Sequence, residues 1–336
     1  MKNKLVALGM LAIIATACKK KEDSPTPDDP QTTTTTGTTT TGGGITSGYT
    51  GAINSGPLNV YVIDTAKINA ISETGTAETT LLNKTVNTSS YIMSFSNSTD
   101  GSKFVYSVSQ SNFSGPSPVY TKEIRTANAN GSGDQLVYAI PGGTTYIGAT
   151  RYGLSNKIYY TTDNFPSSDL YSINTDGTSN NKIFTWASGI KDVSVDGNYL
   201  LTSSSTGNNI QLIDRLGDGG AGSVYYTEIF ASSITTMGNG CLSLDTKKAF
   251  IPYNESGSLK LRVIDLAAKT SSTKTVAAIS GPYFFISAKV ASDGDRVIIT
   301  VTNGTNSTSY NYKVSTSFLS GSFINNDENI SGVYPY

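Results

Sequence analysis

Histidine is absent from the 336 residues of this chain, and cysteine occurs only twice. Without histidine the protein cannot use a Ser-His-Asp triad, a Cys-His dyad, a histidine general base or a His-ligated zinc or iron site. Two cysteines in a chain of this length cannot form a disulfide scaffold. The formal net charge of −1 lacks the basic excess that nucleic-acid binding requires, so we expect no nucleic-acid partner.

Charged and hydrophobic residues are also scarce. They make up 15% and 37% of the chain, against roughly 25% and 45–50% in ordinary globular proteins. Thr, Ser, Asn and 33 Gly take their place, and the aromatic residues include 20 Tyr. This composition predicts a β-rich protein whose strands are joined by many polar turns.

The N-terminus has the order of regions found in a signal peptide. Lys2 and Lys4 precede an almost entirely apolar run, Leu5–Ala15, which is too short for a membrane-spanning helix of ~20 residues. The run ends in Ala15-Thr16-Ala17-Cys18, which resembles the lipobox of bacterial lipoproteins. That resemblance implies a signal peptide over residues 1–17, cleaved before Cys18, and lipid on Cys18 that anchors the chain to the membrane. An ordinary secretory signal with a chance cysteine is the alternative.

The residues after Cys18 bear on location. No aspartate follows the cysteine directly, and in similar lipoproteins an aspartate there would favour inner-membrane retention. The run Lys21-Glu22-Asp23 resembles surface-export signals of some Gram-negative lipoproteins, although a solvated charge run explains it equally well. We therefore expect an outer-membrane location, with outward exposure as a further hypothesis. Residues 18–48, rich in Thr, Pro and Gly, are predicted to be a disordered linker.

Residues 49–336 contain a weak internal repeat of turns followed by β-runs. The turns lie about 42–54 residues apart, which is the period of a propeller blade, and they are Asp100-Gly101, Ser155-Asn156, Asp196-Gly197, Asp245-Thr246 and Asp293-Gly294. A second alternating run follows each of them, and these outer-strand candidates are Val119–Ile124, Leu170–Ile173, Ile210–Ile213, Leu261–Ile264 and Tyr310–Val314, with Val60–Ile63 in the same role near the start.

This pattern predicts an all-β, six-bladed β-propeller over residues 49–336, with seven blades as the alternative. Only five turn-strand units are complete. The sixth can close if Phe318–Tyr336 supplies inner strands and Ser47–Tyr61 supplies the rest. Such closure ties the two ends of the domain together and removes open sheet edges.

One blade shows a more specific resemblance. The segments Asn156–Asp163 and Asp169–Thr178 resemble the YWTD-type propeller repeat of low-density-lipoprotein-receptor-like proteins and are similar to TolB-like bacterial propellers. Tyr160 takes the place of the motif's Trp, and an extra threonine precedes Asp163. Ser292–Ile298 fits the TolB-like turn. The resemblance implies six blades, a funnel-shaped channel and mostly non-enzymatic binding.

Few residues carry a signal for chemistry. Arg151 and Tyr152 lie in a loop-like stretch before Gly153, and we take them as candidate ligand-binding residues at the mouth of the channel. The flat rings of other residues could form a sugar-binding platform, although strand-core packing explains most of them equally well; these are Trp186 and the tyrosines at 146, 152, 159, 160, 171, 225, 226 and 283.

Catalytic and metal sites are weakly supported. Glycosidase chemistry needs two carboxylates, and no short motif pairs any of the candidate acids, Glu73, Glu78, Glu123, Glu228, Glu255 and Glu328. The Asp-Gly segments lack the spacing of calcium loops and are better explained as hairpin turns. Cys241 lies in a strand-like run, where a buried small side chain is expected rather than a nucleophile. We therefore predict no cofactor, no metal and no assigned catalytic residue.

These observations favour a lipid-anchored, extracytoplasmic propeller that binds a protein or glycan partner. One alternative is a histidine-independent glycoside hydrolase or polysaccharide lyase on the same fold, which needs two acids, or an acid and a tyrosine, in one cleft. Another is a scaffold subunit of an outer-membrane complex, which should present a large apolar patch on the propeller rim.

Overall fold

The computed structural model describes most of the predicted propeller, residues 49–336, and little of the chain before it. All the described residues belong to one compact unit, Thr32–Tyr336, and they are residues 45, 49, 58–64, 66–72, 78–84, 90–112, 119–140, 146–164, 167–203, 208–279, 283–291, 294–303, 309–315, 321–324 and 330–335. The predicted signal peptide, Cys18 and most of the predicted linker lie outside them. Within the described residues no helix is long and apolar enough to cross a membrane.

The described chain is built almost entirely of short strands. The first half contains β1 (Leu58–Asp64), β2 (Lys67–Ser72), β3 (Glu78–Asn83), β4 (Ser90–Asn97), β5 (Lys103–Asn112), β6 (Val119–Asn128), β7 (Gln135–Ile140), β8 (Tyr146–Tyr152), β9 (Lys157–Asn164), β10 (Ser167–Asn174), β11 (Asn181–Trp186) and β12 (Ile190–Val193).

The second half continues the pattern with one 3-10 turn. Its elements are β13 (Tyr199–Ser203), β14 (Asn209–Asp214), η1 (Asp218–Gly220), β15 (Ser223–Ile229), β16 (Ile234–Met237), β17 (Cys241–Leu242), β18 (Lys248–Glu255), β19 (Ser258–Asp265), β20 (Thr270–Ala278), β21 (Tyr283–Val290), β22 (Arg296–Asn303), β23 (Ser309–Ser315), β24 (Gly321–Ile324) and β25 (Ile330–Pro335).

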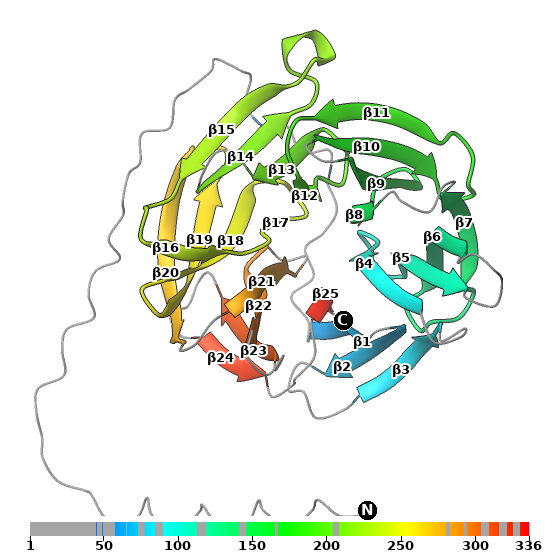
Figure 1. Ribbon diagram of the computed structural model, residues 1–336, viewed down its shortest axis with the longest axis horizontal. Helices are drawn as coiled ribbons and strands as arrows, with labels where there is room; N and C mark the ends of the chain where they lie inside the picture. Colours follow the sequence, from blue (N-terminus) through cyan, green and yellow to red (C-terminus); the bar gives the residue numbers. More distant parts are fainter. Residues whose placement is uncertain are drawn as a thin grey trace, which may run out of the picture. The chain divides into compact units, whose positions relative to one another are not determined.

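The strands form antiparallel sheets that follow one another around a common centre (Figure 1). In strand order they are sheet I (β25-β1-β2-β3), sheet II (β4-β5-β6-β7), sheet III (β8-β9-β10-β11), sheet IV (β12-β13-β14-β15), sheet V (β16-β18-β19-β20, with β17 also on β18) and sheet VI (β21-β22-β23-β24). The first strand of each order lies nearest the centre, except in sheet V, where β17 lies there (Figure 1). The predicted all-β propeller is confirmed.

Sheet I is made from both ends of the domain, so the predicted closure is confirmed. The predicted segments were partly wrong, because β24 belongs to sheet VI and the strands β1–β3, rather than Ser47–Tyr61, supply the rest of sheet I. β25 pairs antiparallel with β1, and Leu58 lies opposite Pro335. The C-terminal stretch therefore provides the innermost strand. This places Val60–Ile63 second from the centre, whereas the other outer-strand candidates lie third. Its assignment to the same role was wrong, because the innermost strand of its sheet, β25, comes from the other end of the domain.

The predicted hairpin turns are confirmed where the structure describes them, and side chains fasten them; Asp293 lies outside the described residues. In the turn Ser194–Tyr199, the Ser194 hydroxyl donates to the Asp196 carboxylate (2.5 Å) and accepts from the Tyr199 N–H (2.9 Å). The Asn198 N–H donates to the same carboxylate. Ser98 with Asp100 and Ser243 with Asp245 repeat this arrangement. The acids of these turns thus satisfy backbone donors, which is the ordinary role of Asp in a turn.

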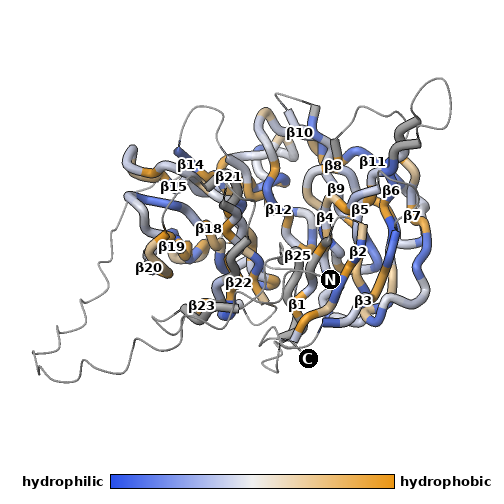
Figure 2. The backbone as a smooth tube through the Cα atoms, turned by 60° about the horizontal axis from the view of Figure 1, so that its bottom comes forward, coloured by the Kyte–Doolittle hydropathy of each residue, from blue (hydrophilic) through white to orange (hydrophobic). Residues whose placement is uncertain are grey.

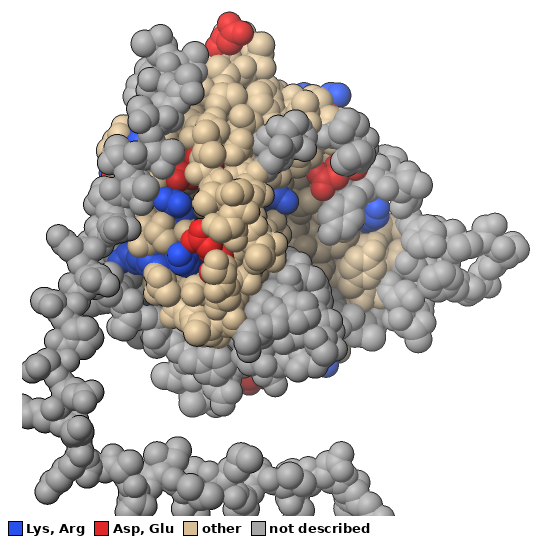
Figure 3. All heavy atoms as spheres, turned by 60° about the vertical axis from the view of Figure 1, so that its left-hand side comes forward, with Lys and Arg blue, Asp and Glu red and all other residues tan. Residues whose placement is uncertain are grey.

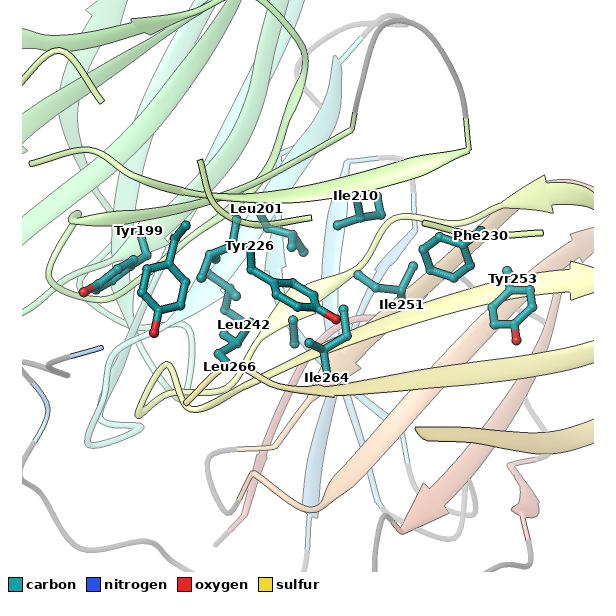
Figure 4. Close-up of a cluster of buried hydrophobic side chains, with 13 residues drawn as sticks. Tyr199, Leu201, Ile210, Tyr226, Phe230, Leu242, Ile251, Tyr253, Ile264 and Leu266 are labelled. Atoms are coloured by element: carbon teal, nitrogen blue, oxygen red, sulfur yellow. The ribbon is translucent and has the colours of Figure 1, made fainter. Parts of the chain in front are cut away.

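The hydrophobic core is divided into clusters that lie between neighbouring sheets. Figure 4 shows one of them, where Leu201 and Tyr226 of sheet IV face Ile251 and Ile264 of sheet V. Ile45, which precedes the residues predicted to form the propeller, packs against the same cluster. Figure 2 shows hydrophilic and hydrophobic positions alternating along the strands. Burial between sheets explains how a chain with few hydrophobic residues still forms a core.

A glycine in the β10–β11 turn of sheet III lies in tight contact with sheet II. Gly177 has φ +85°, and a Cβ added there would lie 2.5 Å from the Val137 carbonyl oxygen of sheet II. Both the left-handed backbone and the clash oppose a side chain. We expect Gly177→Ala to lower the free energy of unfolding by about 2–3 kcal/mol, measured by chemical denaturation.

Gly219→Ala is the matched control for this substitution. Its φ is +67°, but nothing lies within 4 Å of the added Cβ, so only the backbone penalty of about 1 kcal/mol applies. Equal losses for the two variants would contradict the inter-sheet contact.

Candidate functional site

The candidate site is a cavity of about 410 Å³ at the centre of the propeller. Residues of the inner strands β4, β8, β12 and β21 line it, together with the segment between β16 and β17. Its charged lining consists of two lysines and two aspartates, Lys191, Lys289, Asp163 and Asp192. Strands from several sheets thus bring residues far apart in the sequence to one place.

β-Bulges in three inner strands shape this cavity. Ile92 lies opposite Val108, but Ser94 lies opposite Ser107, so Met93 is an extra residue in β4. Lys191 is the extra residue of β12 by the same comparison. Both line the cavity. A bulge leaves a residue unpaired in the ladder and redirects its side chain, which gives the channel side chains that regular strands would place elsewhere.

The bulge in β8 exposes backbone to the cavity. Gly148 and Ala149 lie between the pairs Ile147–Thr162 and Thr150–Tyr160. A Cβ on Gly148 would lie 2.5 Å from the Thr161 hydroxyl oxygen, so glycine is required there. The Thr161 hydroxyl instead accepts the Ala149 N–H at 2.8 Å. Gly148 thus adds no side chain to the wall beside the carboxylate of Asp163, which also lines the cavity.

The predicted ligand-binding residue Arg151 links three sheets. It lies in strand β8 rather than in a loop, because β8 remains paired with β9 up to Tyr152. Its Nη2 donates to the Leu242 carbonyl oxygen (3.2 Å) and lies 3.8 Å from the Asp192 Oδ2. The same Asp192 oxygen accepts the Leu242 N–H at 2.8 Å. Arg151 and Asp192 therefore fasten sheets III and IV to the inner strand of sheet V.

The other predicted ligand-binding residue, Tyr152, is buried in the cluster between sheets II and III. Its backbone N–H donates to the Ser96 hydroxyl at 3.2 Å. Burial, and after it the charge of Asp100, raises the pKa of the Tyr152 hydroxyl. The structure thus brings Arg151, and not the ring of Tyr152, toward the charged groups of the channel wall.

Ser96, Asp192 and Cys241 occupy equivalent positions, two residues before Ser98, Ser194 and Ser243. Each accepts a backbone N–H from the inner strand of the following sheet, from Tyr152, Leu242 and Val290 respectively. This repeated contact explains why Cys241 is buried at its position in the strand. Cys241 is a buried hydrogen-bond acceptor between sheets, and burial raises the pKa of its thiol to about 12, with the Asp192 charge acting in the same direction.

This environment predicts an inert thiol, since the thiolate is the reactive form. Native protein incubated with iodoacetamide at pH 8 should show no label on Cys241, whereas the denatured protein should be labelled fully. Peptide mapping by mass spectrometry reads the site directly. Rapid labelling of the native protein would contradict the buried position.

Most residues of the hypothetical sugar platform lie in the core. Tyr152, Tyr159, Tyr160, Tyr225 and Tyr226 are buried between sheets. Tyr171 stacks on Tyr160 with ring centroids 5.0 Å apart, and Trp186 stacks on Phe184 at 5.9 Å. The side chains of Tyr146 and Tyr283 lie outside the described residues. Strand-core packing is thus the better explanation of the described rings.

The candidate acids among the described residues lie apart from the cavity and have partners of their own. Glu78 accepts from Asn69, Glu123 pairs with Arg125, and Glu255 pairs with Lys260. Glu228 is buried beside Arg262. Glu73 and Glu328 lie outside the described residues. The hairpin interpretation of Asp176-Gly177 is confirmed, since the Gly177 N–H donates to the Asn174 carbonyl.

Sequence reasoning missed the two lysines of the cavity. Lys191 lies three residues before Ser194, and Lys289 lies two residues before Ala291, the residue that takes the serine's place in the last inner turn. The sequence pattern predicted the turns, but it did not predict the inner strands that precede them in the chain. Counting backward from each turn would have placed these residues on the channel wall, although the bulge that redirects Lys191 leaves no mark in the sequence.

Solved structures with the same arrangement are numerous. TolB from Acinetobacter baumannii superposes with a TM-score of 0.59 at 17% identity, covering 84% of this chain and 67% of that one. A chain of a nidogen/laminin complex gives 0.55 at 10%, covering 82% and 97%. A putative TolB from Agrobacterium tumefaciens gives 0.53 at 10%, covering 83% and 92%. The fold is that of a β-propeller with TolB-like neighbours.

The likeness to these propellers is one of fold, because the sequence identities are low. No family model matches the chain, and no curated protein sequence matches it. The comparisons therefore show the fold alone.

Proposed function

We propose that the chain is an envelope lipoprotein held in the outer membrane by lipid on Cys18, and that its six-bladed propeller binds a partner through the central channel. The cavity supports the binding part of this proposal, and the lipobox-like run Ala15–Cys18 supports the anchor. The cavity is lined by bulged inner-strand residues and by charged groups of both signs. On the face seen in Figure 3, the described residues show Lys and Arg interspersed with Asp and Glu among uncharged atoms.

Binding, rather than hydrolysis, suits the chemistry of this cavity. Asp192 is held by Arg151 and by the N–H groups of Val193 and Leu242. Asp163 accepts the Ser168 hydroxyl at 2.6 Å. Each acid thus has a structural role in the channel wall. Concave sites with a few convergent polar groups are the usual form of ligand-binding sites.

A photo-crosslinker tests channel binding in the native envelope. Benzoylphenylalanine in place of Ala149, which lines the cavity, should form adducts with a partner in intact cells. Benzoylphenylalanine in place of Leu136, which is 49% exposed on the outer strand β7, is the matched control and should form none. Adducts at the outer position alone would favour a rim-bound scaffold and overturn channel binding.

The lipid anchor is tested separately. The mature N-terminal peptide should begin at Cys18 and carry acyl chains by mass spectrometry, and Cys18→Ala should release the protein from the membrane fraction. A mature chain with an unmodified N-terminus would remove the anchor from the proposal and leave channel binding intact.

A further inference from the structure

Two lysines of the channel wall have no acidic partner among the described residues. Lys191 and Lys289 are half-buried and line the cavity, and neither takes part in any of the ion pairs there. Asp192 follows Lys191 in the chain, but its carboxylate is bound to Arg151 and to two backbone N–H groups. Neither lysine is therefore paired with a carboxylate within the described wall.

The charge balance of the cavity favours an anion. Arg151 with Asp192 forms a neutral pair, which leaves two ammonium groups against the single carboxylate of Asp163. Half-buried ammonium groups lose part of their hydration and repel each other when they share a site. An entering anion relieves both costs and forms charge-assisted hydrogen bonds, which are stronger than neutral ones.

The shape of the wall favours a peptide over an acidic sugar. The bulges leave inner-strand backbone groups outside the regular ladder, and an extended peptide supplies matching N–H and C=O groups. The Thr150 hydroxyl is buried on this wall and has no hydrogen-bond partner among the described residues. Phe95 is the aromatic residue among the described lining residues, and it is only 4% exposed, so the described wall offers no ring on which a sugar could stack.

We propose that Lys191 and Lys289 bind a carboxylate of an extended peptide inside the channel. The carboxylate is either a C-terminus or an Asp or Glu side chain, since both present the same two oxygen atoms. This inference rests on the proposed channel-binding function and adds the chemical class of the group that is recognised.

Lysine-resolved NMR of the full-length protein tests the proposal. Lysines carrying ¹³C-dimethyl groups keep their charge and give one resonance each, which Lys191→Gln and Lys289→Gln assign. N-acetyl-Gly-Gly, with a free C-terminal carboxylate, should shift both resonances along one saturable curve at constant ionic strength. N-acetyl-Glu methylamide tests the side-chain source. The amide of N-acetyl-Gly-Gly should shift neither. Lys247, whose side chain is 70% exposed beside Asp245, is the matched control and should not respond.

The lysine variants measure how much the two side chains contribute to the affinity for the acid probe. Lys191→Gln/Lys289→Gln should weaken binding of the acid probe about tenfold or more, whereas Lys247→Gln should leave it unchanged. Equal binding of acid and amide, or unchanged binding by the double variant, overturns the proposal. Binding of trigalacturonate without binding of either peptide probe also overturns it, in favour of an acidic glycan.

Failure here can be told from failure of the proposed function. Suppose that the double variant still forms adducts at position 149 and that Ala149→Trp blocks binding of the partner. Channel binding is then supported, and recognition of a carboxylate by the two lysines is contradicted. If the wild-type lysines respond to no probe and position 149 forms no adduct, the channel is not the binding site. Circular dichroism spectra matching the wild type confirm that each variant is folded.

Discussion

A chain truncated after residue 329 is expected to lose its cooperative thermal unfolding transition and to aggregate. The deletion removes β25, which is the innermost strand of sheet I and pairs with β1 from Leu58 to Val62. Without it β1 becomes an open edge beside the channel, and the last sheet is no longer joined to the first. Exposed edges of this kind template pairing with other chains, and propellers rely on closure to avoid them.

Differential scanning calorimetry and light scattering measure this effect. Deletion of Tyr336 alone is the control, because the described pairing of β25 ends at Pro335. That variant should melt like the full chain. A truncated protein that melts cooperatively within a few degrees of wild type would show that closure by β25 is dispensable.

The second large effect is expected at a buried ion pair between sheets IV and V. The side chain of Glu228 is fully buried, and its carboxylate lies 3.5 Å from the Arg262 Nε. It also accepts the hydroxyls of Tyr226 (2.5 Å) and Ser271 (3.0 Å). The Arg262 guanidinium lies over the Phe230 ring, 5.3 Å from its centroid. Removing the arginine leaves a buried carboxylate without a cation.

Arg262→Met should therefore lower the free energy of unfolding by about 4 kcal/mol, in the range found when one partner of a buried pair is removed. Methionine keeps much of the contact with the aromatic rings, so the loss reports mainly on the charge. Urea denaturation at pH 7 measures it.

Two matched variants separate charge from packing. Arg262→Met/Glu228→Gln removes the unpaired charge. Its amide oxygen accepts one of the two hydroxyls and its NH2 group donates to the other, since a hydroxyl oxygen can also accept. This double variant should recover most of the loss. Lys247→Met breaks an exposed pair with Asp245 and should change stability by less than about 1 kcal/mol. A double variant no more stable than Arg262→Met would assign the effect to packing.

The fold was largely predictable because turns and closure depend on local chemistry. Asp196-Gly197 and its equivalents mark hairpins since Asp accepts backbone N–H groups and Gly adopts positive φ. The order of the strands followed from their spacing, apart from Val60–Ile63, whose place depends on a strand from the other end of the chain.

The channel was less predictable because it depends on residues that no local pattern marks. Lys191 faces the cavity at a bulge, which is set by how β12 fits against β13 and not by the letters around it. Arg151 was singled out, but its partners Asp192 and Leu242 come from two other sheets. Such contacts exist only once the sheets surround a common centre.

The position of β1 has a mechanical consequence for a protein tethered by its N-terminus. β1 lies between β25 and β2 and pairs with both along most of its length. A load drawn along β1 from Leu58 must shear two ladders of hydrogen bonds at once, whereas an edge strand would peel away bond by bond. If the chain is anchored at Cys18 as proposed, the first strand to receive a pull on the anchor is therefore one that is paired on both sides.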